Sequence, residues 1–217
     1  MATTAQSIIL DAQTALQDPL GTRWAASELV RHLNRAQRVI QVARPDTTAV
    51  RAPFALAAGV RQTIPEAASA LIDIPCNTNG TPITKVDVVQ LDAVQKGWRQ
   101  LAQTASVTHF MHDLRLPRQF EVYPPAIAAS SVDMEYSAYP TDVSAPSGDG
   151  KAASTVSGNI SLGDQWAPAL MHMVLHYAYL KDAEYNGNPE LAVVHIQRAE
   201  QMLGVQLQAT TTVAPKS

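Results

Sequence analysis

Charged side chains are scarce in this chain of 217 residues, because they make up only 16% of it, whereas about 25% is usual for soluble proteins. The formal net charge is −3, so the chain as a whole lacks the strongly basic character of a nucleic-acid-binding domain. A surface poor in charge is typical of one that partners cover, since the centres of protein interfaces are depleted in charged residues.

Cysteine and long apolar runs are scarce as well. The single cysteine, Cys76, excludes an internal disulfide, and its strand-like surroundings favour a small buried apolar role. No apolar run approaches the roughly 20 residues of a membrane-spanning helix, and the N-terminus lacks the positive region of a signal peptide. We therefore expect no membrane association and synthesis in a cytoplasm-like compartment.

Motifs for phosphate binding and nucleophilic catalysis are missing. The chain contains neither Gly-x-x-x-x-Gly-Lys nor Gly-x-Gly-x-x-Gly, the loops that cradle phosphates. It also lacks the Gly-x-Ser-x-Gly turn that presents a nucleophilic serine. These absences predict a protein that is not an enzyme and that needs no cofactor.

Two pairs of side chains nevertheless have the spacing of chemical sites. His172 and His176 are four residues apart on an expected helix, so they share one face and are weak candidates for metal ligands. The zinc-protease pattern also requires Glu after the first His, and Met173 occupies that position. Asp133 and Glu135 share one face of an expected strand, which suits acid–base work, but a half-solvated strand has the same pattern. We expect no metal and no catalytic pair.

Three arginines form a local basic feature. Arg31, Arg35 and Arg38 follow one another at spacings of four and three, so they lie on one face of an expected helix. A solvated helix face explains them most simply, and a nucleic-acid-binding face remains an alternative. Salt-dependent binding of duplex DNA would distinguish the two interpretations.

Helical periodicity marks both ends of the chain. An apolar stripe at Leu29, Leu33, Ala36 and Ile40 predicts a helix that begins near Ser27 and ends before Pro45. The other expected helices span residues 5–17, 164–184 and 188–204. The last of these begins with Asn188 as the N-cap and Pro189 in the first turn.

The middle of the chain has the pattern of β-structure. Short runs separated by turn signals predict strands at 54–60, 71–74, 83–89, 107–111, 120–123 and 132–136. Asn77-Thr78-Asn79-Gly80 is a turn signal. Residues 90–98 predict one helical turn, and residues 140–160 are rich in Gly, Ser and Pro, which is typical of a loop.

The fold class that follows is α+β. We expect a four-helix bundle formed by N- and C-terminal helix pairs, because four apolar stripes need partner surfaces. The bundle would comprise residues 1–47 and 161–207, with a small antiparallel β-rich lobe inserted at 48–140. Residues 141–160 would form a flexible loop and residues 208–217 a flexible tail.

Several segments, taken in order, resemble a known family. The longest match is Ala178-Tyr179-Leu180-Lys181-Asp182-Ala183-Glu184-Tyr185-Asn186-Gly187-Asn188, and the others are Leu33-Asn34-Arg35-Ala36-Gln37-Arg38, Leu71-Ile72-Asp73-Ile74, Phe120-Glu121-Val122-Tyr123-Pro124-Pro125 and Tyr136-Ser137-Ala138-Tyr139-Pro140. In order and spacing they resemble the bacteriophage head-to-tail adaptor, or connector, proteins of short-tailed phages. The resemblance covers most of residues 20–205.

This resemblance implies a structural virion protein at the head–tail junction, assembled in the host cytoplasm. It implies a ring, expected to be a dodecamer, that docks under the portal protein, joins it to a tail or nozzle protein and lets DNA pass without specific binding. Leu207, Val213 and Pro215 near the C-terminus are candidates for docking on a partner. The alternative within the same class is a stopper or tail-completion protein of the phage neck.

Overall fold

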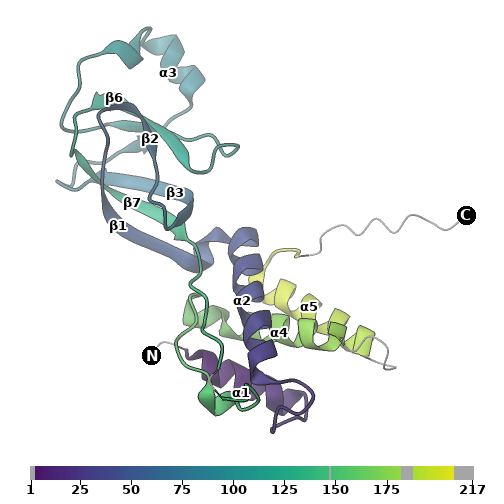
Figure 1. The fold of residues 1–217 in the computed structure, drawn as a ribbon. Helices are drawn as coiled ribbons and strands as arrows, with labels where there is room; N and C mark the ends of the chain where they lie inside the picture. The colour runs from purple at the N-terminus through teal and green to yellow at the C-terminus, as the bar shows by residue number, and fades with distance from the viewer. Residues whose placement is uncertain (1–2, 147, 182–187, 208–217) are drawn as a thin grey trace, which may run out of the picture. The chain divides into compact units, whose positions relative to one another are not determined.

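The computed structural model describes residues 3–146, 148–181 and 188–207. This part of the chain contains five α-helices and two β-sheets. Contacts divide the chain into two compact units, a helical unit of residues 1–47 and 140–217 and a sheet unit of residues 48–139. Figure 1 shows the helical unit in purple, green and yellow and the sheet unit mainly in blue and teal.

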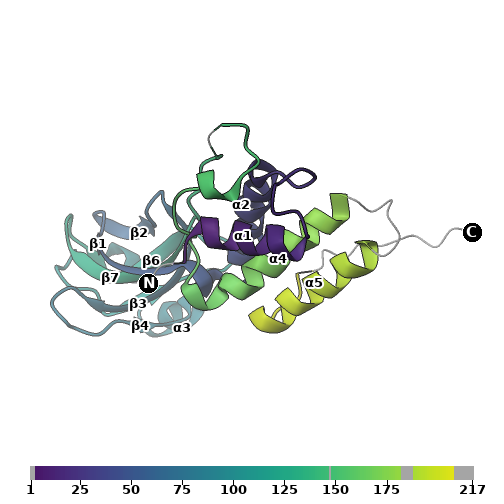
Figure 2. The ribbon, with the colours of Figure 1, turned by 90° about the horizontal axis from the view of Figure 1, so that it is seen from below.

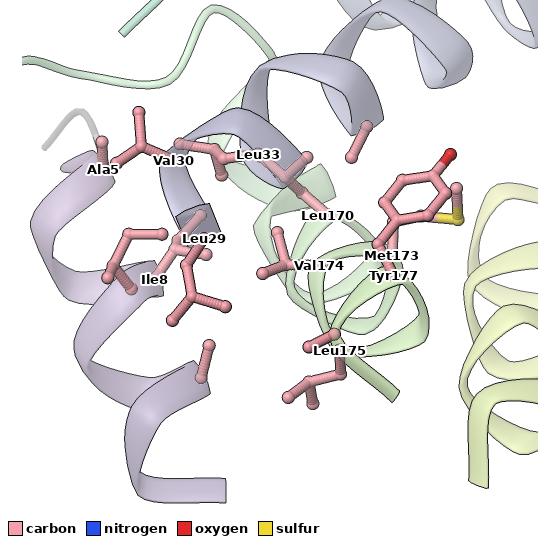
Figure 3. Close-up of a cluster of buried hydrophobic side chains, with 14 of the residues drawn as sticks. Ala5, Ile8, Leu29, Val30, Leu33, Leu170, Met173, Val174, Leu175 and Tyr177 are labelled. Atoms are coloured by element: carbon pink, nitrogen blue, oxygen red, sulfur yellow. The ribbon is translucent and has the colours of Figure 1, made fainter. Parts of the chain in front are cut away.

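The helical unit contains four of the five helices. In chain order they are α1 (Ala5–Ala15), α2 (Ala26–Ala43), α4 (Ala167–Lys181) and α5 (Asn188–Leu203). The apolar stripe predicted for α2 is confirmed, because Leu29, Leu33, Ala36 and Ile40 are all fully buried. In Figure 3 the side chains of Ile8, Leu29 and Val174 lie in the space between α1, α2 and α4.

The prediction of a four-helix bundle made of N- and C-terminal helix pairs is wrong, because α4 is a central helix. Helices α1 and α2 pack on α4, and α5 packs along it, so that α1 and α5 lie on opposite sides of α4 in Figure 2. A helix that is apolar all round is one that neighbours surround. The buried residues of α4 are Ala169, Leu170, Met173, Val174, Leu175, Tyr177 and Ala178.

Helix α5 buries only a narrow strip of its surface, because it packs mainly on α4. Its buried residues are Ala192, Ala199 and Leu203. Its apolar residues Leu191, Val194 and Met202 are 42%, 39% and 47% exposed. A bundle would have required α5 to bury a wider face.

The segment that leads back from the sheet unit completes the helical core. Residues 141–160 were expected to form a flexible loop, but Val143, Ala153, Val156 and Ile160 are buried in the same cluster as the helices. The Asn34 side chain holds Val143 through two hydrogen bonds of 2.9 Å, one to its N–H and one to its carbonyl. Because these few apolar residues are widely spaced among Gly and Ser, the composition of the segment did not indicate that it packs in the core.

The sheet unit consists of two sheets. The strands are β1 (Ala49–Ala55), β2 (Gly59–Thr63), β3 (Ala68–Asn77), β4 (Thr84–Lys85), β5 (His109–Met111), β6 (Gln119–Ala126) and β7 (Ser131–Ala138). One sheet has the order β1-β7-β3 and the other β2-β6-β5-β4. All pairings are antiparallel except that of β4 with β5, which is parallel, so the expected purely antiparallel lobe is also corrected.

Two predicted strands differ in the structure. The run at 54–60 is not one strand, because the chain passes at residues 56–58 from the first sheet to the second. The run at 83–89 forms only the short strand β4, after which helix α3 (Val88–Val94) begins. The Asp87 carboxylate accepts a hydrogen bond of 2.8 Å from the N–H of Val89 and thereby caps this helix.

The alternation predicted for β7 is confirmed. Val132 and Met134 are fully buried, and Tyr136 packs against the same core. The turn at Asn77 is confirmed too, because the N–H of Gly80 donates to the Asn77 carbonyl over 2.8 Å. The buried Asn77 amide also accepts from the N–H of Val107 at 3.0 Å and donates to its carbonyl at 2.8 Å, which ties the turn to the strand region before β5.

Candidate interaction surfaces

The two weak candidates for metal ligands do not converge. His172 and His176 both extend from α4 toward α5, but they make separate contacts there. Nδ1 of His172 lies 2.9 Å from Nδ1 of His195, and Nδ1 of His176 donates to the carbonyl of Ala192 over 2.8 Å. In the described part of the chain, no three or more His, Cys, Asp or Glu side chains are grouped as a metal site would need.

The histidine that sequence reasoning missed is His195, which lies on α5. Antiparallel helices bring together residues that are equally far from their junction, and 172 with 195 and 176 with 192 satisfy that relation. Tyr179 stacks on the His195 ring, with 5.5 Å between the ring centroids. Had the two helices been recognised as an antiparallel pair, this spacing would have identified the contact.

Burial favours the neutral form of His172 and His195, because it lowers the pKa of both side chains. Desolvation, followed by the charges of His172, Arg198 and His176, lowers the pKa of His195 to about 4. The pKa of His172 is lowered as well, by desolvation and by Arg198. Two neutral rings can share one N–H···N hydrogen bond, so the pair fixes α5 on α4 near neutral pH.

Asp133 and Glu135, the two carboxylates that share one strand face, are engaged in ion pairs. Nη2 of Arg51 lies 3.4 Å from Asp133 and its Nη1 lies 3.5 Å from Glu135, so both carboxylates balance one guanidinium on the outer face of the β1-β7-β3 sheet. Cys76 lies beside them, half-buried rather than buried, with its Sγ 3.7 Å from Asp133. The expectation that Cys76 is a buried apolar residue is therefore corrected.

The sheet unit has a groove that the sequence did not reveal. It has a volume of about 790 Å³ and is lined by residues of α3, by the β5–β6 loop and by the adjoining strands. Val89, Leu114 and Leu116 are 70%, 80% and 54% exposed along it. Clustered exposed apolar side chains are typical of sites for protein contact.

A small cluster of hydrogen-bonded side chains fixes the loop after α3 beside this groove. The buried Trp98 donates through Nε1 to Asp92 over 2.8 Å, and Arg99 bonds both Asp92 at 2.7 Å and Glu121 at 3.2 Å. Hydrogen bonds from Trp98 and Arg99 lower the pKa of Asp92. The loop after α3 is thus attached to strand β6.

Of the three candidate docking residues at the C-terminus, one lies within the described region and two lie outside it. Leu207 is half-buried against the helical core, and its N–H donates to the Glu200 carboxylate over 2.7 Å. Val213 and Pro215 lie outside the described residues.

The arginine face of α2 is only partly as predicted. Arg31 and Arg35 are exposed, while Arg38 forms an ion pair with Asp142.

No helix in the described residues has the length and apolar character that crossing a membrane requires.

Comparison with known families matches the chain almost from end to end. The sequence pattern of the family described as SU10 adaptor protein covers residues 3–216 and therefore both structural units. No curated protein sequence matches the chain. The chain therefore belongs to the SU10 adaptor protein family, which makes it a structural adaptor protein of a phage.

Proposed function

We infer that this protein is the head-to-tail adaptor subunit that docks under the portal and joins it to the tail or nozzle protein. The observation that carries this inference is the family match over residues 3–216, since it includes the helical unit and the sheet unit together. The protein would act at the head–tail junction of the virion, after assembly in the host cytoplasm.

An adaptor of this kind works through surfaces and not through catalysis. The ring that we propose, a dodecamer, needs two different faces on each subunit, because neighbours around a closed rotation meet head to tail. The exposed apolar groove of the sheet unit and the exposed strip of α5 support such contacts. The low share of charged residues supports them too, since interface centres are depleted in charge.

The C-terminal residues, with Leu207, Val213 and Pro215, are proposed to dock on the portal. The support for this is compositional, because Val213 and Pro215 are apolar residues within the Thr-rich stretch 208–217, and Leu207 immediately precedes it. Removal of residues 208–217 should then abolish assembly with the portal while leaving the helical unit folded. A truncated chain that assembles like the full one would exclude this role of the tail.

The test of the function itself is co-assembly with the portal protein encoded by the same phage or prophage. The two full-length proteins are mixed at micromolar concentration, and the mass of the complex is measured by light scattering after gel filtration. We expect one copy per portal subunit. If a well-folded portal ring binds none, the adaptor role is wrong and a stopper bound elsewhere in the neck takes its place.

A further inference from the structure

The chain is held in place for several residues beyond the end of helix α5. Gly204, with a φ of +67°, ends the helix in the left-handed conformation that glycine adopts readily. The N–H groups of Gly204 and Val205 both donate to the Glu200 carbonyl, over 2.8 and 3.3 Å, and the Glu200 carboxylate accepts from the N–H of Leu207 at 2.7 Å. Because Val205 and Leu207 also pack against the helical core, the chain keeps a defined path as far as Leu207.

A second anchor on this turn comes from Arg44, at the end of α2. Its Nη1 donates to the carbonyl of Leu203, the last residue of α5. Its Nε donates to both carboxylate oxygens of Asp46, at 3.1 and 3.2 Å, and its guanidinium lies over the Trp166 ring at 4.4 Å from the centroid. These contacts fix the orientation in which the guanidinium meets α5. We call Arg44, Glu200 and residues 203–207 the exit clamp.

The exit clamp acts where α5 is otherwise weakly held. Only Ala192, Ala199 and Leu203 of this helix are buried. The carbonyl groups in the last turn of a helix have no partner within the helix, and a cation near them is favoured by the helix dipole. Without the Arg44 guanidinium, we expect the last turn of α5 to fray and residues 204–207 to be released with it.

The position of this turn matters because residues 208–217 begin there. An extended chain advances about 3.5 Å per residue at most, so a segment of ten residues such as 208–217 reaches about 35 Å. Release of residues 204–207 could shift the starting point of that segment by up to about 14 Å. Each released residue would also have to be ordered again on docking, which costs conformational entropy. A fixed start therefore raises the effective concentration of the segment at its partner.

We propose that Arg44 is a positioning residue for docking on the portal. By holding the Leu203 carbonyl, it fixes the point from which residues 208–217 extend toward that partner. The inference rests on the proposed docking of the C-terminal residues, and it adds the part of the helical unit that directs them. Arg44 acts through the turn after α5 and not by contact with the portal.

The test measures the affinity of full-length variants for the portal ring by titration in sedimentation velocity experiments. Arg44→Gln should lower the affinity about tenfold, which corresponds to the cost of ordering about one more residue. Arg44→Lys should lower it to a similar extent, because lysine has no planar fork that stacks on a ring and holds a carbonyl at the same time.

An insertion separates positioning from a general loss of stability. Gly-Ser-Gly-Ser placed between residues 207 and 208 frees the segment from the exit clamp, so it should lower the wild-type affinity as well. Arg44→Gln should then add less than about a twofold loss, since two changes that act through the same contact are not additive. A variant that merely destabilises the helical unit would lose the same factor with and without the insertion.

The matched control is Arg38→Gln. Arg38 is an exposed arginine of the same helix that pairs with Asp142 and lies outside the exit clamp, so this variant should bind the portal like the wild type. Hydrogen exchange at the N–H groups of Val205 and Leu207 should be faster in Arg44→Gln and unchanged in the control.

Several results would overturn the proposal. They are unchanged exchange or unchanged portal affinity in Arg44→Gln, an insertion without effect on the wild type, and equal losses with and without the insertion. Full binding by Arg44→Lys would also overturn it, because a charge contact with the portal would then explain the role of Arg44. A wild type that binds no portal would refute the adaptor role itself, and this inference with it.

Discussion

Acidification should loosen α5 from α4 through the histidine pair. The contact between His172 and His195 needs one ring that donates from Nδ1 and one that accepts at Nδ1. His195 has the pKa of about 4, so it is the natural acceptor, while His172 can take a proton at Nε2 and still donate. Protonation of His195 removes the acceptor lone pair and leaves two donors facing each other.

The size of the effect follows from the difference between folded and unfolded pKa values. An unfolded histidine titrates near 6.5, and His195 in the fold titrates at about 4. Because the folded value is lower, the unfolded chain binds more protons below about pH 6.5, and stability falls as the pH falls. From about pH 7.5 to 5 the ceiling is about 2 kcal/mol. The rings are partly exposed, so screening by water reduces our expectation to about 1 kcal/mol.

The assay is urea denaturation across this pH range for the wild type and for His195→Gln, which keeps a polar side chain but cannot gain a proton. The difference in unfolding free energy between the two proteins isolates this one titration, since all other groups are shared. We expect the wild type to lose about 1 kcal/mol more than the variant by about pH 5. Parallel curves for the two proteins would refute the reasoning.

Three further substitutions test the packing. Leu29→Ala should destabilise the helical unit by about 2–5 kcal/mol in thermal or urea unfolding, since Leu29 is fully buried; a loss below about 1 kcal/mol would contradict its place in the core. Gly21→Ala should cost about 2 kcal/mol or more, because Gly21 has a φ of +62° and a Cβ there would lie 2.2 Å from the Lys151 carbonyl oxygen, and normal stability would disprove that close approach. Asn77→Ala should cost about 1–3 kcal/mol by stranding the N–H and carbonyl of Val107, and hydrogen exchange at Val107 should rise.

Sequence patterns correctly predicted the features that depend on a single helix or strand. The stripe of α2 at Leu29 to Ile40 and the alternation of Val132 and Met134 in β7 both appear in the structure as expected. Each pattern reports which face of a single helix or strand is apolar, and burial of that face follows whatever the partner is.

The actual packing of the helices could not be predicted, because an apolar stripe shows which face of a helix is buried but not which element covers it. Helix α4 is apolar on nearly all sides, so one stripe read along it conceals a second contact surface. The histidine contact has the same limitation. His172 was recognisable on its expected helix, but His195 joins it only because α5 packs along α4.

The helical turn predicted at 90–98 overlaps α3 (Val88–Val94), but the beginning of this helix was assigned to a strand for a different reason. The run at 83–89 has β-branched residues that favour a strand, and Asp87 is a good helix cap only if the chain turns there. The Asp87 cap outweighs the strand preference of these residues, since the helix begins immediately after it. Tertiary context overrides propensity most readily in segments this short.

The way the sheet unit starts and ends has an evolutionary consequence. Its first strand, β1, pairs with its last strand, β7, with Ala49 opposite Ser137. Directly opposed residues in an antiparallel pair are about 5 Å apart at their Cα atoms, so the chain enters and leaves this unit at almost one point. A few glycines would span that distance. Another domain whose two ends lie equally close together could therefore replace the whole unit in evolution, while the helices keep their sequence and their core.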